Sequence, residues 1–116
     1  LLSAIPLQQI LQSNRAHAVL VIEETPAELA PQKQVPIVKF PFTLGRAGCD
    51  FVISEPRVSR QHAKIVQHGD KFYLIDLNSS NYTFLAGQQI KPGELNQLQP
   101  NVTIRLGRRT VLRFEV

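Results

Sequence analysis

VTIRLGRRTVLRFEV, residues 102–116, is the stretch that decides the fold. In its first part Val102, Ile104 and Leu106 alternate with polar residues, and from residue 112 to 116 apolar residues recur at every second position. Such alternation places one face of a strand in the core and the other in water. Gly107 and Arg108 lie between the two runs and favour a tight turn. The stretch therefore predicts a hairpin of two half-buried strands.

The rest of the chain repeats this arrangement of short strands and turns. Pro36 and Pro41 cannot donate ladder hydrogen bonds, so the β-rich run over 34–44 is expected at a sheet edge or broken by a bulge. Turn signals recur about every 8 to 12 residues and no long helical period is present, which predicts an all-β sandwich or barrel. Three further β-rich runs and two turns complete the pattern: 17–23, 61–67, 71–77, His68-Gly69-Asp70 and Pro92-Gly93.

The length of 116 residues and the hydrophobic fraction of 43% fit one domain with one core. We expect this domain over residues 17–116, preceded by a linker or short helix over residues 1–16, where Pro6 interrupts a rough helical period. The chain opens at Leu1 and contains no Met, so we expect further domains in a longer parent protein. No run of about 18 apolar residues is present, so we expect no membrane partner.

The formal net charge of +4 suits an anionic partner. The sequence contains one dense basic cluster, which is interpreted most simply as a solvated strand face without a binding role: Arg105, Arg108, Arg109 and Arg113. A basic barrel that binds nucleic acid is a rival class, but aromatic residues make up only 7% and Trp is absent, so we expect no nucleic-acid partner. Cys49 is the only cysteine, which excludes an internal disulfide and favours the cytoplasm.

Three polar clusters interrupt the predicted strands: residues 44–46, 57–63 and 76–83. Ser59, His62 and a nearby aspartate allow a catalytic triad to be imagined, but Ser59 has no G-x-S-x-G pattern and two arginines flank it. The histidines show no metal-ligand spacing, and no nucleotide-binding glycine motif is present. We therefore expect no enzyme, no metal and no cofactor.

A phosphate pocket fits these clusters better than catalysis does. Guanidinium groups bind phosphate oxygens with two parallel hydrogen bonds, and hydroxyl and backbone N–H groups fill the remaining positions. Three loops supply such a set: Arg46, Ser59, Arg60 and Ser80. Each of these residues, considered alone, could also be a solvated arginine or a serine of a turn.

The order of the clusters resembles the forkhead-associated (FHA) family. That family has Gly-Arg after an early strand, an acidic residue a few positions on, then V-S-R-x-H-A and D-x-x-S-x-N-G-T. The matching stretches here are Gly45-Arg46, Asp50, residues 58–63 and residues 76–83. The resemblance covers residues 34–116, with 17–23 as the first strand. It implies a β-sandwich of about eleven short strands with the binding site in the loops at one end.

The resemblance also implies a function and a role for each matched residue. The function is to bind phosphothreonine in a partner protein, a substrate of a Ser/Thr kinase, and so to serve signalling through protein–protein interaction. Arg46, Ser59, Arg60 and Ser80 would bind the phosphate. Asn81 would hold the peptide backbone, and Arg57 would contact the third residue after the phosphothreonine. Structural roles fall to Gly45, His62, Asp76 and Thr83.

Two departures from the family pattern favour an alternative function. Tyr82 replaces the family's Gly, and Ala86 replaces the Asn of the next turn. A Tyr at positive φ would store about 1–3 kcal/mol of strain, so we expect the loop to be reshaped. A reshaped loop would fit an FHA-like scaffold or oligomerisation domain that needs no phosphate.

Overall fold

The computed structural model describes residues 17–26 and 34–116. The linker or helix predicted over residues 1–16 lies outside these described residues. Within them no helix is long and apolar enough to cross a membrane. The described residues form eleven strands: β1 (Ala18–Glu24), β2 (Gln34–Ile37), β3 (Phe42–Gly45), β4 (Phe51–Val52), β5 (Ala63–His68), β6 (Lys71–Asp76), β7 (Thr83–Leu85), β8 (Gln88–Gln89), β9 (Asn96–Gln97), β10 (Val102–Leu106) and β11 (Thr110–Glu115).

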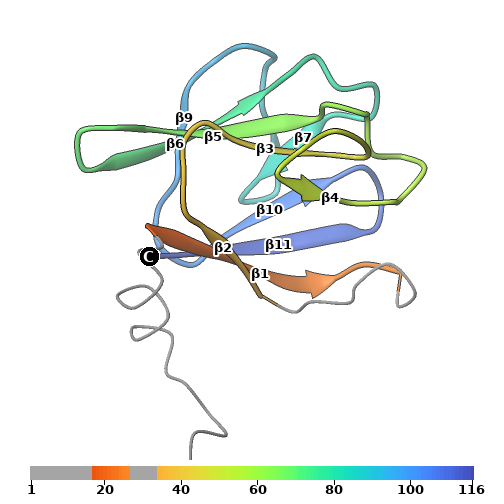
Figure 1. Cartoon of the computed structure of the whole chain (residues 1–116). Coiled ribbons are helices and arrows are strands. Elements are labelled where there is room, and N and C mark those ends of the chain that lie inside the picture. Colours follow the sequence, from red (N-terminus) through yellow and green to blue (C-terminus); the bar gives the residue numbers. More distant parts are fainter. Residues whose placement is uncertain (1–16, 27–33) are drawn as a thin grey trace, which may run out of the picture.

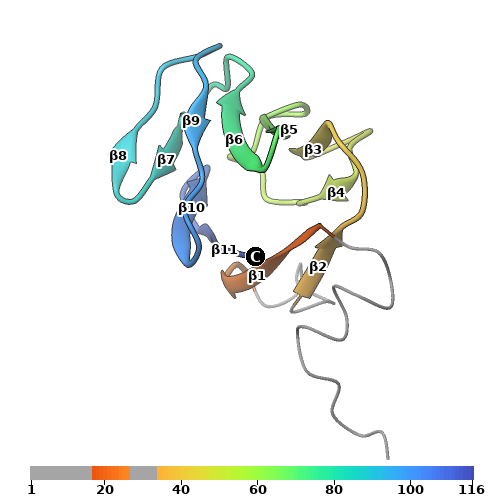
Figure 2. The ribbon, with the colours of Figure 1, turned by 90° about the vertical axis from the view of Figure 1, so that its left-hand side faces the viewer.

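The strands form two sheets that pack face to face (Figure 1, Figure 2). The six-stranded sheet has the order β2-β1-β11-β10-β7-β8, and the five-stranded sheet has the order β4-β3-β5-β6-β9. Neighbouring strands run antiparallel, except that β3 and β4 pair in parallel. The predicted all-β sandwich of about eleven short strands is therefore confirmed.

The hairpin predicted over residues 102–116 is formed by β10 and β11. Ile104 pairs with Leu112, and Leu106 pairs with Thr110 across the turn. The side chains of Ile104, Leu106 and Leu112 are fully buried, whereas Thr103 on the opposite face is exposed. Period-two alternation in the sequence thus corresponds to one face in the core.

The β-rich run over 34–44 is two strands, because the chain crosses from one sheet to the other between them. Pro36 lies in β2, which is an edge strand of the six-stranded sheet. Pro41 follows a cis peptide bond and directly precedes β3, which pairs with β4 and β5 in the other sheet. The expected edge position is confirmed for β2, whereas the run is broken by the crossing between the sheets and not by a bulge.

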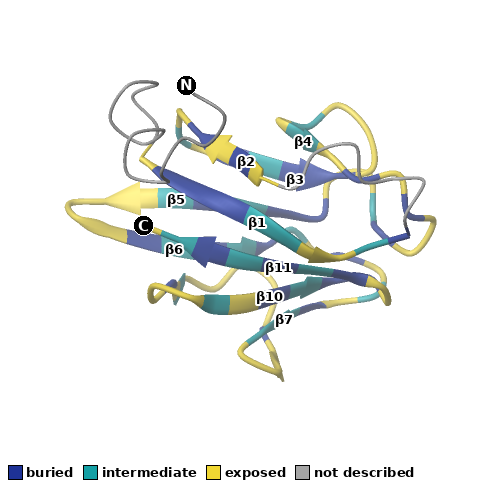
Figure 3. Cartoon of the chain, turned by 90° about the horizontal axis from the view of Figure 1, so that it is seen from below, coloured by how far each residue is buried: buried dark blue, intermediate teal, exposed yellow. Residues whose placement is uncertain are grey.

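The core lies between the two sheets, where the strands are buried (Figure 3). Phe72 of β6 lies 5.5 Å from Phe114 of β11, measured between ring centres, so aromatic rings join the sheets. At one end of the sandwich β5 and β6 turn at Gly69 (Figure 1). At the other end β3 stops at Gly45, β5 begins at Ala63 and β6 stops at Asp76, so the intervening loops lie together there. We call this side the loop end.

Candidate functional site

Three loops of the loop end meet at Ser59. The Arg46 backbone N–H donates to the Ser59 carbonyl oxygen at 2.9 Å. The Ser80 backbone N–H donates to the Ser59 hydroxyl oxygen at 3.0 Å. These two bonds bring together residues from the β3–β4, β4–β5 and β6–β7 loops, which are separated by up to 34 positions in the chain.

Several donors at this junction remain for a ligand. Arg46 Nε donates to the Val58 carbonyl oxygen at 2.9 Å, which fixes the plane of the guanidinium group. Arg46 is exposed, and its Nη1 and Nη2 atoms have no hydrogen-bond partner among the residues that the structure describes. The Ser59 hydroxyl accepts a hydrogen bond, so its own hydrogen is left to donate.

Arg60 joins this junction through its backbone. Its carbonyl oxygen accepts from the Ala47 N–H at 3.3 Å and from the Cys49 thiol at 3.2 Å, while its side chain is exposed. Gly45 lies against the same carbonyl group, since a Cβ at Gly45 would come within 2.1 Å of the Arg60 oxygen. Any side chain at position 45 would push the β4–β5 loop away.

Asp50 closes the β3–β4 loop onto the strand before it. Its carboxylate accepts from the Thr43 backbone N–H at 2.9 Å and from the Thr43 hydroxyl at 3.0 Å. Lys39 forms an ion pair with the same carboxylate at 3.0 Å. The Thr43 backbone N–H is the main cause that lowers the pKa of Asp50, so this loop is closed at neutral pH.

His62 is fully buried and links two of the loops. Its Nδ1 accepts the Ser59 backbone N–H at 3.0 Å, so the neutral ring carries its hydrogen on Nε2. That nitrogen donates to the Tyr82 carbonyl oxygen at 2.9 Å. Burial lowers the pKa of His62, although the Tyr82 carbonyl and the carboxylates of Asp76 and Glu55 oppose the shift. A neutral ring therefore holds the Ser59 loop against the Tyr82 loop.

Asp76 organises the β6–β7 loop from its start. The carboxylate is 2% exposed and accepts from the Ser79 N–H at 3.1 Å, from the Ser79 hydroxyl and from the Thr83 hydroxyl at 2.6 Å. The bonds span both ends of residues 79–83, which carry Ser80 and Asn81. The position of Ser80 next to Ser59 thus depends on a buried carboxylate.

Asn81 and Arg57, the two predicted peptide contacts, lie side by side. Asn81 Nδ2 donates to the Arg57 carbonyl oxygen at 3.0 Å, and the Arg57 side chain is exposed. The amide nitrogen of Asn81 is therefore used within the domain. Its amide oxygen is the atom left to accept an N–H from a peptide.

Glu55 is a structural residue of the loop end that the sequence did not single out. It is 2% exposed, and its carboxylate accepts from the backbone N–H groups of Arg108 and Arg109 at 3.0 Å each and from the Thr110 hydroxyl at 2.5 Å. These bonds fasten the β4–β5 loop to the β10–β11 turn. The donors lie at least 53 positions away, so no local spacing pattern could reveal them.

Tyr82 keeps the backbone conformation expected of glycine. Its φ is 68°, and Ala86 likewise has a positive φ of 50°. The expectation that the loop is reshaped to avoid this conformation is wrong. The bonds to Asp76 and His62 fix the backbone on both sides of Tyr82, and half of the Tyr82 surface stays in solvent. The departures from the family pattern therefore add local strain without displacing the loop.

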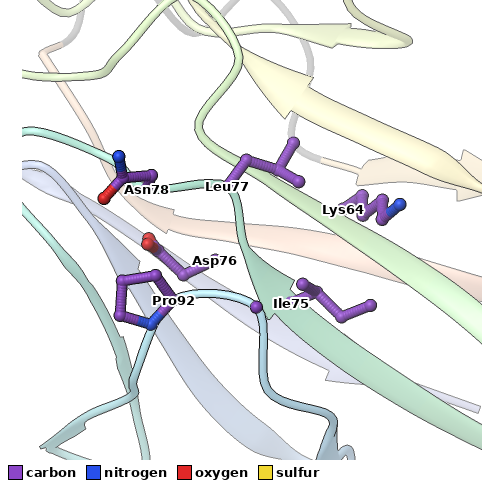
Figure 4. A pocket seen from close by; sticks show the side chains of 7 residues that line it. Lys64, Ile75, Asp76, Leu77, Asn78 and Pro92 are labelled. Carbon is purple, nitrogen blue, oxygen red and sulfur yellow. The ribbon is translucent and has the colours of Figure 1, made fainter.

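A depression near this site is lined by residues of β5, of β6 and of the loops that follow β6 and β8 (Figure 4). Its volume is about 530 Å³, and it contains none of the predicted phosphate-binding residues. Its lining offers a single cation, Lys64, together with the amide of Asn78 and the hydrogen-bonded carboxylate of Asp76. The remaining lining residues are Ile75, Leu77, Pro92 and Gly93. Over residues 17–26 and 34–116 no group of three His, Cys, Asp or Glu side chains could hold a metal ion. The junction at Ser59 is therefore the better candidate for an anion.

A β-sandwich whose loop end presents free guanidinium and hydroxyl donors has the construction of an anion-binding interaction module. A model of the FHA domain family matches residues 42–107. The chain belongs to the FHA domain family, and FHA domains are interaction modules rather than enzymes.

Known relatives agree with this assignment. Protein FraH of Nostoc sp. (strain PCC 7120) is 33% identical over 114 residues, which are 94% of this chain and 38% of FraH. The chain thus spans well under half of that relative. The solved structure of the MEK1 FHA domain in complex with a HOP1 phosphothreonine peptide is 28% identical, with a TM-score of 0.69 over 87% of this chain and 97% of that one. Mycobacterium tuberculosis EmbR in complex with a low-affinity phosphopeptide is 26% identical, with a TM-score of 0.70 over 85% of this chain and 24% of EmbR.

Proposed function

We propose that this domain binds phosphothreonine in a partner protein and so makes protein association depend on phosphorylation. The observation that carries the proposal is the junction at Ser59, where two hydrogen bonds bring Arg46 and Ser80 together. The junction leaves the terminal guanidinium nitrogens of Arg46 and the Ser59 hydroxyl hydrogen free. These are the donors that bind the oxygens of a phosphate group most strongly.

The similar solved structures support a peptide as the ligand. The MEK1 FHA domain holds a phosphothreonine peptide, and EmbR holds a phosphopeptide. In this chain Asn81 and Arg57 adjoin the phosphate-binding junction and supply an amide oxygen and a guanidinium group for the residues that follow the phosphothreonine. Arg60 lies next to the junction and would add a second guanidinium group to the phosphate.

The expected affinity follows from these contacts. A phosphothreonine carries nearly two negative charges at pH 7, and each hydrogen bond to a charged group contributes about 1.5–3 kcal/mol. Three such bonds would give a preference of about 4.5–9 kcal/mol over the unmodified hydroxyl, and the cost of desolvating the phosphate reduces it. A dissociation constant near the micromolar range fits an exposed and reversible site, and it corresponds to a binding free energy of about −8 kcal/mol.

Arg46→Ala tests the proposal directly. We expect the variant to lose at least about 100-fold in affinity for phosphothreonine peptides, because it loses the charged bonds to phosphate. Titration calorimetry with an oriented set of phosphothreonine, phosphoserine and unmodified peptides measures this. Lys71→Gln is the matched control, since it removes one exposed positive charge at the opposite end of β5 and β6.

Thermal unfolding of both variants shows whether the fold is retained. Unchanged affinity of the Arg46→Ala protein would remove Arg46 from the site. A partner bound equally well after phosphatase treatment would favour the alternative, a scaffold or oligomerisation domain that needs no phosphate. In either role we propose a binding domain without catalysis that acts in the cytoplasm as one domain of a longer protein.

A further inference from the structure

Two arginines near the C-terminus are occupied by partners within the sandwich. The Arg105 guanidinium carbon lies 4.0 Å from the centre of the Phe84 ring. Arg113 forms ion pairs with Glu23 at 2.7 Å and with Glu115 at 2.5 Å. Both arginines lie on strands, so the interpretation as a strand face fits them.

The other two arginines of the cluster differ from this pair. Arg108 and Arg109 lie in the turn between β10 and β11 and are exposed. Their side chains form no ion pair and no hydrogen bond within residues 17–26 and 34–116. Arg108 and Arg109 are solvated, as that interpretation expects, but they lie in a turn and not on a strand face, and these two charges are available to a partner.

The turn is fixed against the peptide-binding side of the loop end. A Cβ at Gly107 would lie 3.1 Å from the carbonyl carbon and oxygen of Arg57, so the turn is in close contact with that residue. The buried Glu55 carboxylate holds the backbone N–H groups of Arg108 and Arg109 at 3.0 Å. The two guanidinium groups are thus carried on a fixed backbone next to Arg57.

Positive charge is in excess at this end. Asp50 pairs with Lys39, and the carboxylates of Glu55 and Asp76 are buried and hydrogen-bonded within the domain. Glu24, opposite Val111 at the start of β11, is an exposed carboxylate beside the turn. Five exposed arginines of the loop end have no ion pair in the described part of the chain: Arg46, Arg57, Arg60, Arg108 and Arg109. Such a surface attracts a ligand with more negative charge than one phosphate supplies.

We infer that the β10–β11 turn extends the phosphopeptide site, so that Arg108 and Arg109 bind anionic side chains just beyond the residue that contacts Arg57. The anionic residues are aspartate or glutamate, or a second phosphorylated residue. This inference rests on the proposed function. An extended peptide advances about 3.3 Å per residue, so a peptide that leaves the Ser59 junction past Asn81 and Arg57 continues towards the turn. Exposed ion pairs are individually weak, and two of them should raise affinity about three- to tenfold.

The experiment uses peptides that share one phosphothreonine core and differ in the tail after the third position. One tail is neutral, one carries three aspartates, and one carries a phosphoserine; a fourth peptide has the aspartate tail and an unmodified threonine. Affinities are measured for the full chain, for the double variant Arg108→Gln/Arg109→Gln, and for the control Lys71→Gln/Arg113→Gln, which removes the same net charge away from the turn.

We expect both anionic tails to bind the unchanged chain and the control about three- to tenfold more tightly than the neutral tail. The turn variant should lose this gain while it binds the neutral-tail peptide as before. The larger of the two gains identifies whether acidic or phosphorylated residues are preferred.

Equal binding of neutral and anionic tails, or a gain that survives in the turn variant, would overturn the inference while leaving the proposed function intact. If the neutral-tail phosphothreonine peptide does not bind either, the proposed function and this extension of it are both overturned. A mixed-sequence single-stranded DNA that binds through Arg108 and Arg109 as tightly as the anionic tails would replace the peptide by a nucleic acid.

Discussion

Asp76 and Glu55 are two buried carboxylates of the loop end, and each is only 2% exposed. Asp76 accepts from Ser79 and Thr83, three and seven positions further along the chain. Glu55 accepts from the β10–β11 turn, 53 to 55 positions away. The same chemistry therefore shapes one loop locally and ties another loop to a distant turn of the other sheet.

The difference shows how this fold fixes its loops through buried carboxylates and not through large hydrophobic clusters within the loops. A buried carboxylate is costly unless hydrogen bonds satisfy it, and each of these two has three donors. The donors and the acceptor then stabilise each other, because moving either one away would leave the buried carboxylate without its hydrogen bonds. The bonds to Asp76 position Ser80, whereas the bonds to Glu55 position Arg108 and Arg109.

Replacing either carboxylate by its amide should have the largest effect on stability. Glu55→Gln and Asp76→Asn keep the shape but remove the charge and leave a donor facing donors, so we expect each to lower the free energy of unfolding by about 2–4 kcal/mol. Denaturant unfolding measures the loss. Glu94→Gln is the control, because Glu94 is exposed, and we expect a change within about 0.5 kcal/mol.

The two amides should then differ in binding. Asp76→Asn should weaken the neutral-tail phosphothreonine peptide, since Ser80 loses its position. Glu55→Gln should mainly reduce the gain from anionic tails. A loss of stability below about 1 kcal/mol for either amide, or identical binding by both, would contradict the distinction between the two carboxylates.

Thr83→Val and Thr110→Val separate the hydroxyl contribution from the rest of each network. Both threonines are buried and donate to a carboxylate, Thr83 to Asp76 and Thr110 to Glu55. We expect each substitution to cost about 1–2 kcal/mol. Double-mutant cycles with the matching amide variants should give coupling energies of at least about 0.5 kcal/mol, and the crossed pairs should be additive. Coupling between Thr83 and Glu55 would show that the two networks are one.

The family resemblance assigned structural roles to Asp76 and Thr83, which lie close together in the chain. Asp76, Ser79 and Thr83 fall within one motif, and alternation over 102–116 placed β10 and β11 correctly. Glu55 escaped because its donors are backbone N–H groups, which every residue type carries, so nothing in residues 108 and 109 marks them as its partners. The positive φ of Tyr82 was mispredicted for a related reason: its local preference is overridden by bonds from Asp76 and His62. Residue patterns thus predict what neighbours in the chain decide, and they miss what the packing of two sheets decides.

Lower pH should weaken the connection that His62 makes between the β4–β5 loop and the β6–β7 loop. Burial lowers the pKa of His62, so the native state takes up a proton less readily than the unfolded chain, whose histidine pKa is about 6.5. The contribution of His62 to the free energy of unfolding is therefore fully present above about pH 6.5 and is lost as the pH drops below it, by at most about 1.4 kcal/mol per pH unit. Denaturant unfolding at several pH values between 7.5 and 5.5 measures the slope.

Three variants test whether this pH dependence of stability comes from His62. His62→Gln should flatten it, whereas His68→Gln, in the exposed end of β5, should leave it unchanged. Glu55→Gln should extend the decline to lower pH, because the Glu55 charge raises the pKa of His62 and its removal lowers that pKa further. A slope that survives in the His62→Gln protein would assign the pH dependence to another group.

The smallest effect on the free energy of unfolding is expected for a substitution of Tyr82, the strained residue of the β6–β7 loop. Tyr82 has a φ of 68°, a conformation that disfavours side chains with a Cβ, and half of its surface is exposed. We expect Tyr82→Gly to raise the free energy of unfolding by about 0.5–1 kcal/mol, because relief of strain outweighs the added freedom of the unfolded chain. Gln61→Gly, at an exposed loop position without positive φ, should instead lower it by a similar amount. If Tyr82→Gly also lowers stability, the Tyr82 side chain contributes contacts that exceed its backbone strain, and the Asp76-held loop is stabilised by its own packing as well as by the carboxylate.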